Sequence, residues 1–131
     1  MRNSAREAAL TILFAQQFNE SATETFKSSV YKKFDLIKEE DLQFAKELIS
    51  VVEKNRAELI LGIEEACHHY RENRINPTDK VILLIAMAEI KYFDDIPPVV
   101  SVSEAVGLAR KYSTDTSADF VNGVLSGVIN R

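Results

Sequence analysis

The amino-acid sequence predicts an all-α protein that forms a single domain of about seven helices. Apolar residues recur at intervals of three and four through most of the chain, which is the spacing of one face of a helix. The 131 residues also include only four glycines and three prolines, too few for a turn-rich β-sandwich or a disordered tail. A chain of this length can bury roughly two-thirds of its surface, so we expect it to fold without cross-links.

The composition excludes several classes of protein. The formal net charge of -4 argues against a non-specific nucleic-acid coat, because phosphate binding normally needs a strongly basic face. The single cysteine, Cys67, excludes an intramolecular disulfide and the cysteine-rich zinc sites. No segment has the roughly 20 apolar residues of a membrane span, and the first residues lack a signal-peptide cleavage pattern. We therefore expect a cytoplasmic protein without membrane contact.

The first helix is predicted to begin at a capping box formed by Ser4 and Glu7. Alanines and aliphatic residues then form one inward stripe, and Phe14 lies on a second face as either the edge of the core or an exposed aromatic. A second capping box, from Ser21 to Glu24, predicts a helix that ends near Asp35. We expect its lysines to form a solvated face.

The middle of the chain predicts three further helices. One begins at the acids Glu39–Asp41, and Asn55 is either a break or a new N-cap, which leaves two consecutive helices or one bent helix. Asn76 precedes a proline, so a boundary falls before Pro77 and separates helical halves at about 1–75 and 76–131. The nearly continuous apolar run of residues 81–90 predicts a central buried helix.

Two helices are predicted in the last third. After the connector 94–98, Ser101 or Ser103 together with Glu104 is expected to cap a helix. The polar segment 113–117 is expected to form a loop before the last helix. Gly123 and Gly127 lie four residues apart in that helix, where we expect them to permit a close helix crossing.

No catalytic or metal site stands out in the sequence. Cys67, His68 and His69 follow Glu64 and Glu65, but adjacent histidines point about 100° apart on a helix and no third group is evident to orient a base. Glycine loops and metalloprotease or nucleophile motifs are absent from the sequence. We therefore expect no enzyme activity, no cofactor and no metal.

Several motifs spread over nearly the whole chain resemble the NusB family. The most specific is Phe120-Val121-Asn122-Gly123-Val124-Leu125 near the end, preceded by Asp79-Lys80-Val81 and Glu89-Ile90-Lys91-Tyr92 in the middle and by Ala5-Arg6-Glu7-Ala8-Ala9 near the start. The resemblance implies two small helical bundles and a role in antitermination and ribosomal RNA transcription. The implied partners are boxA-like RNA, the ribosomal protein NusE and the transcription elongation complex.

The resemblance also implies site residues. The RNA surface of the family corresponds to a set at the start of the first helix, in the central helix and before the last helix, namely Arg2, Arg6, Lys80, Thr116 and Ser117. Partner contacts correspond to Phe14, where the family more often has Tyr, and to Asp79. Members often carry consecutive arginines at the start, whereas this chain has Asn3 and Ser4 between its two. We therefore expect weak RNA binding by the chain alone, strengthened by the partner.

Two alternatives remain open from the sequence. One is a helical scaffold or homodimer with little RNA affinity, which the negative net charge favours. The other is the NusB-like RNA-binding module of an RNA cytosine methyltransferase system, against which the length argues because the chain ends at Arg131 with no methyl-donor domain.

Overall fold

The computed structural model describes residues 2–18, 23–67 and 75–130. These residues form helices and no strand, which confirms the predicted all-α class. The helices are α1 (Arg2–Gln16), α2 (Glu24–Lys33), α3 (Glu39–Lys54), α4 (Arg56–Ala66), α5 (Pro77–Tyr92), α6 (Pro98–Tyr112) and α7 (Asp115–Ile129).

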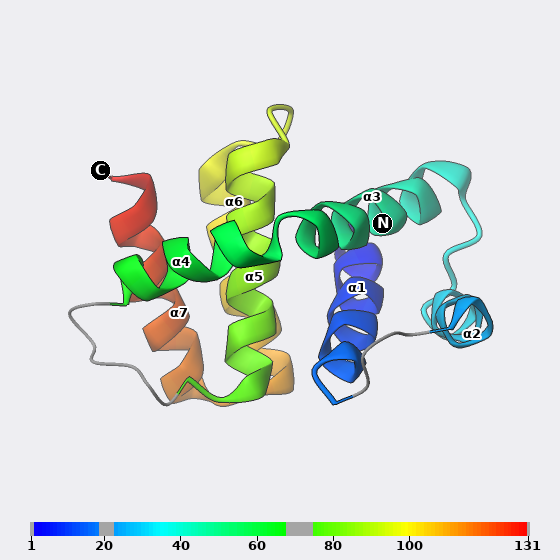
Figure 1. The fold of residues 1–131 in the computed structure, drawn as a ribbon, viewed down its shortest axis with the longest axis horizontal. Helices are drawn as coiled ribbons and strands as arrows, with labels where there is room; N and C mark the ends of the chain where they lie inside the picture. The colour runs from blue at the N-terminus through cyan, green and yellow to red at the C-terminus, as the bar shows by residue number, and fades with distance from the viewer. Residues whose placement is uncertain (1, 19–22, 68–74, 131) are drawn as a thin grey trace.

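Helix α5 is the centre of the fold, as its apolar sequence predicts. Every residue from Val81 to Glu89 is buried, and the helix packs against α1, α3, α4, α6 and α7. Figure 1 shows α5 upright in the middle of the molecule, with α1 on one side and α7 on the other. Asn76 caps the helix, since its side chain accepts from the amide of Asp79, and Pro77 occupies the first turn, where a missing amide does no harm.

Side-chain contacts fix the direction of α1 against α5. Arg6, near the start of α1, contacts Glu89 near the end of α5, while Gln17 after α1 donates to the carbonyl of Pro77 at the start of α5. The two helices are therefore antiparallel. The molecule has an upper end in Figure 1, where α1 begins and α5 leads into α6, and a lower end, where α1 ends and α5 and α7 begin.

The packing of α4 bears on the division into halves. Helix α4 crosses α5 and also contacts α7, whereas α1 packs chiefly against α3, α5 and α2 (Figure 1). Asn55 lies at the N-cap position of α4, but its side chain makes no capping hydrogen bond and donates to the carbonyl of Val51 at the end of α3. The packing thus groups α4 with the later helices. The division near residue 75 stays a prediction based on the sequence.

Two predicted helix caps were wrong. Helix α1 begins at Arg2, so Ser4 lies inside it, and Glu7 bonds Lys111 and Tyr112 of α6 instead of Ser4. Helix α6 begins at Pro98, because proline suits the first turn, and Ser101 therefore lies in its interior. Both serines match a local capping pattern, but the helix starts earlier in each case.

The caps of α2 and α7 are threonines. The hydroxyl of Thr23 accepts from the amide of Phe26, and Ser21 of the predicted capping box lies outside the described residues. Thr114 accepts from the amide of Ser117, so Thr116 and Ser117 belong to the first turn of α7 rather than to a loop. The prediction that the whole segment 113–117 is a loop was therefore wrong in its second half.

Gly127 does not have the role that the sequence predicted, and the prediction for Gly123 stays untested. A Cβ added at Gly127 would meet no heavy atom within 4 Å, so the expected close crossing at this position was wrong. A Cβ at Gly62 would lie 2.9 Å from the end of the Met87 side chain. The close approach to the central helix thus involves Gly62 of α4.

Candidate nucleic-acid and partner interface

Arg6 forms a buried ion pair at the centre of the molecule. Its Nε and Nη2 donate to the two carboxylate oxygens of Glu89 at 2.7 and 2.8 Å, which is a bidentate pair. Ser101 donates to the same carboxylate at 2.9 Å, and Glu104 lies 3.7 Å from Nη1 of Arg6. The Arg6 and Glu89 side chains are 4% and 1% exposed. The pair therefore joins α1, α5 and α6 inside the fold.

This geometry changes the interpretation of Arg6. An arginine at the start of a family-like helix was expected on the RNA surface, but its guanidinium faces the core and is held by Glu89. We therefore assign Arg6 to the fold rather than to a direct RNA contact. The sequence signal that was missed is Glu89, an acid within the apolar run of the central helix, because a buried carboxylate there requires a cationic or hydrogen-bonding partner.

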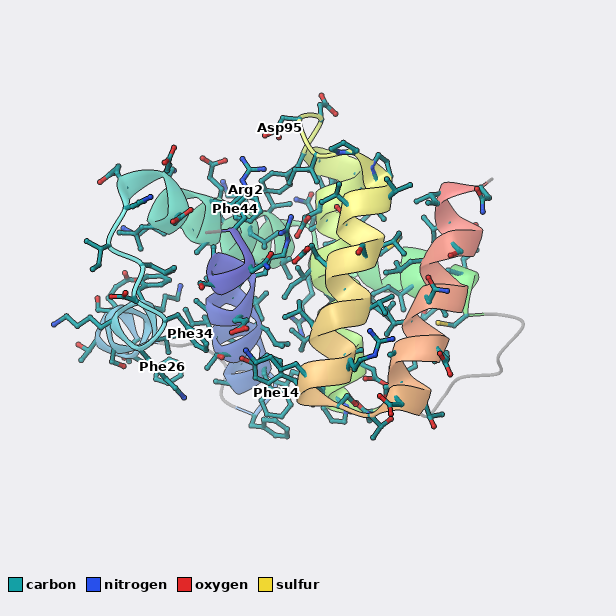
Figure 2. The ribbon with its side chains drawn as sticks, turned by 180° about the vertical axis from the view of Figure 1, so that it is seen from behind. Arg2, Phe14, Phe26, Phe34, Phe44 and Asp95 are labelled. Carbon is teal, nitrogen blue, oxygen red and sulfur yellow. The ribbon has the colours of Figure 1, made fainter. Side chains whose placement is uncertain are left out.

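Arg2 is the exposed arginine of α1. Its Nη2 lies 3.2 Å from Oδ2 of Asp95, and the two side chains are 47% and 64% exposed. The guanidinium carbon also lies 4.5 Å from the ring centroid of Phe44 in α3. Figure 2 shows Arg2, Phe44 and Asp95 together at the upper end of the molecule. This end thus presents a partly neutralised cation rather than a basic patch.

The lower end carries a shallow apolar hollow beside Phe14. Leu10, Thr11, Phe14, Thr78 and Tyr112 line a cavity of about 200 Å³ where α1, α5 and α6 meet. Phe14 is half-buried and packs edge to face on the exposed Phe18, with ring centroids 5.2 Å apart. An aromatic beside an apolar hollow is the arrangement that commonly anchors a protein partner.

Asp79 lies at this end but points into the structure. Its amide donates to Asn76 at 2.8 Å and its Oδ2 accepts from the Asn76 amide at 3.2 Å, so Asp79 and Asn76 cap each other. Asp79 is 4% exposed, and its Oδ1 is buried without a hydrogen-bond partner in the described part of the chain. The structure therefore brings Phe14 and the Asp79 backbone to one end, with the carboxylate serving first as a helix cap.

The remaining predicted RNA residues begin helices at the lower end. Lys80 is half-buried in the first turn of α5, and Thr116 is exposed in the first turn of α7. Ser117 is buried, and its hydroxyl accepts from Ser113 and Thr114 at 2.9 and 3.1 Å. Since α1 is 15 residues long, its two ends lie about 20 Å apart at about 1.5 Å per helical residue, and Arg2 is at the upper one. The predicted RNA residues therefore divide between the two ends.

A polar cluster borders the apolar hollow. Lys111 donates to both oxygens of Glu7 at 2.6 and 3.2 Å, and the Tyr112 hydroxyl donates to the same carboxylate at 3.0 Å. Burial, followed by this hydrogen bond and the negative charge of Glu7, raises the pKa of Tyr112 to about 12. The cluster holds α6 against α1 and thereby fixes one wall of the hollow.

Other candidate chemistry finds no geometric support in the described residues. Cys67 is buried, and His68 and His69 lie outside the described ranges. Within residues 2–18, 23–67 and 75–130, no three histidine, cysteine or acidic side chains are placed to hold a metal ion. No helix in these ranges is both long enough and apolar enough to span a membrane.

Comparison with known proteins extends over almost the whole chain. Residues 3–130 match the model of the NusB family. The transcription antitermination proteins NusB of Natranaerobius thermophilus and Clostridium novyi are 32% and 35% identical in sequence to this chain. These similarities cover 99% and 98% of this chain, and 95% and 97% of the two relatives.

Solved structures have the same fold. A crystal structure of the antitermination factors NusB and NusE in complex with dsRNA superposes with a TM-score of 0.86 at 22% identity, covering 98% of this chain and 96% of the other. The NusB of T. maritima superposes with a TM-score of 0.85 at 23% identity, covering 100% of this chain and 92% of the other. At these identities the similarity establishes the fold.

Proposed function

Because the chain belongs to the NusB family, we propose that it is a transcription antitermination factor that binds boxA-type RNA together with the ribosomal protein NusE. The observation that carries this proposal is the family match over residues 3–130, which spans the helices of the described residues except for Arg2 at the start of α1. The factor acts in the cytoplasm as part of a transcription elongation complex and catalyses no reaction itself.

The partner surface in this proposal is the lower end around Phe14. The hollow beside Phe14 accepts an apolar side chain, and the exposed ring of Phe18 extends the apolar area around it. Burial of such an aromatic and of the hollow supplies most of the affinity at an interface of this kind. Asp79 follows Thr78 of the hollow, and its Oδ1 atom, which has no hydrogen-bond partner among the described residues, can accept a donor from the partner if the side chain turns outward.

The RNA surface in this proposal combines two separate groups. Lys80 and Thr116 lie at the starts of α5 and α7, where Lys80 supplies a positive charge and the exposed Thr116 a hydroxyl that can contact the RNA backbone. Arg2 contributes from the upper end. A chain of net charge -4 with so few exposed cations on this surface binds RNA weakly alone, so NusE supplies much of the cationic surface.

Calorimetric titration with a NusE-type protein tests the partner surface. Phe14→Ala removes the aromatic beside the hollow and should weaken binding at least tenfold, since an anchor residue at an interface contributes about 2 kcal/mol or more. Phe26→Ala, on the separate helix α2, is the matched control and should leave the affinity unchanged. Equal affinities for wild type and Phe14→Ala would contradict the proposed surface.

A further inference from the structure

The pair formed by Arg2 and Asp95 is built unlike a phosphate site. Asp95 places a carboxylate against the Arg2 guanidinium, and Asp94 precedes it in the same loop. A phosphate bound here would face these carboxylates, and the repulsion between like charges would offset its attraction to Arg2. An uncharged polar group meets no such repulsion. The local charge therefore favours a neutral ligand.

The hydrogen-bonding groups of this pair remain partly available. The contact uses one guanidinium nitrogen and one carboxylate oxygen, at 3.2 Å, and both side chains are about half exposed. Arg2 keeps further N–H donors, and Asp95 keeps its second oxygen as an acceptor. A neighbouring donor and acceptor match the edge of a nucleobase, where an N–H group lies beside a ring nitrogen or a carbonyl oxygen.

Phe44 holds the Arg2 guanidinium in place. The ring of Phe44 is 5% exposed and packs edge to face on Phe93, with centroids 5.6 Å apart. It therefore offers a fixed aromatic surface to the guanidinium 4.5 Å away. Figure 2 shows Arg2 beside Phe44 at the end of the molecule where Asp95 lies. A planar guanidinium held in this way loses little conformational freedom when it donates hydrogen bonds to a ligand.

From these observations we propose that Arg2, Asp95 and Phe44 form a subsite for one unstacked nucleobase of single-stranded RNA. Arg2 donates to the edge of the base, Asp95 accepts from an N–H on the same edge, and Phe44 positions the Arg2 guanidinium. The subsite recognises a base rather than the RNA backbone. This inference rests on the proposed RNA-binding function and names Asp95 as a residue that determines which base is bound.

The test combines abasic RNA with two variants of the subsite. A short boxA-like RNA, carrying an abasic position at each site in turn, is titrated by fluorescence anisotropy against the chain with its NusE-type partner. Wild type should lose roughly tenfold in affinity at one abasic position, the size of one good hydrogen-bonded contact to a base edge. Asp95→Ala, which removes the acceptor, and Arg2→Lys should lower the affinity for intact RNA by a similar factor and remove the effect of that abasic position.

Glu24→Gln is the matched control, since it removes an exposed, lysine-paired carboxylate on α2 and should bind like wild type. Thermal unfolding of each variant confirms folding. Unchanged or tighter RNA binding by Asp95→Ala would overturn the inference, because that result is expected if the Asp95 carboxylate only repels phosphate. An abasic effect that persists in both variants also overturns it. If wild type binds no RNA even with its partner, the proposed function fails together with the subsite. If wild type binds RNA but the variants behave like wild type, only the subsite fails.

Discussion

Replacing Arg6 by alanine tests whether this arginine belongs to the core. The substitution leaves the Glu89 carboxylate 1% exposed with Ser101 as its remaining donor. Removing one partner of a buried ion pair costs about 3–5 kcal/mol, because the remaining charge is buried without compensation. A domain of 131 residues has an unfolding free energy of about 7–20 kcal/mol, at about 0.05–0.15 kcal/mol per residue. The variant should therefore lose a large fraction of its stability.

Two further variants separate charge from burial. Arg2→Ala breaks the exposed pair with Asp95 and should lower the free energy of unfolding by only about 0.2–1 kcal/mol. The double variant Arg6→Met and Glu89→Leu replaces the buried pair by apolar side chains, and it should recover most of the stability lost in Arg6→Ala. Urea unfolding followed by circular dichroism measures all three.

The reasoning would be refuted if Arg6→Ala lowered the unfolding free energy by no more than Arg2→Ala. It would also be refuted if the double variant were folded and stable yet lost RNA affinity as strongly as a direct contact residue. Either result would mean that the Arg6 guanidinium is available at the surface. A stable double variant that binds RNA like wild type would confirm its role in the fold.

Two further predictions concern pH and helix glycines. The pKa of Tyr112 is about 12 in the folded chain and 10.0 ordinarily. The neutral phenol therefore stabilises the fold fully below pH 10, and this contribution to the unfolding free energy is lost as the pH rises to 12. Tyr112→Phe should therefore lose less stability than wild type over that interval in urea unfolding, and an equal loss would contradict the raised pKa. Gly107→Ala, in the interior of α6 with no atom within 4 Å of the added Cβ, should raise the unfolding free energy by about 0.5–1 kcal/mol. Gly62→Ala should raise the unfolding free energy by less, because its Cβ would displace the end of the Met87 side chain. An equal increase in both variants would show that the Met87 side chain moves away without cost.

Much of the helical architecture could be predicted because local rules fix it. The Asn76-Pro77 pair marks the start of α5, since a residue before proline avoids the helical region and proline suits a first turn. The apolar run that follows predicts a helix buried on all sides, which the packing of α5 confirms. These features depend on near neighbours in the chain.

Features that depend on distant contacts could not be predicted. Ser101 matches an N-cap, but Pro98 starts α6 a turn earlier and Ser101 instead donates to Glu89. Nothing within α1 indicates that Arg6 meets a carboxylate 83 positions away. The resemblance of the first helix to the family therefore suggested that Arg6 lies on the surface, whereas the packing of α1, α5 and α6 decides that it is buried. The apolar hollow, formed by three helices, likewise has no local signature.

The most direct measurement is the affinity of a boxA-like RNA for the wild-type chain, determined with and without a NusE-type protein and compared with a scrambled RNA at two salt concentrations. We predict weak binding alone, because the chain carries a net charge of -4, and tighter, salt-sensitive binding with the partner that favours the boxA-like sequence. RNA binding that the partner does not strengthen, or that does not distinguish the two RNAs, would contradict the proposed function.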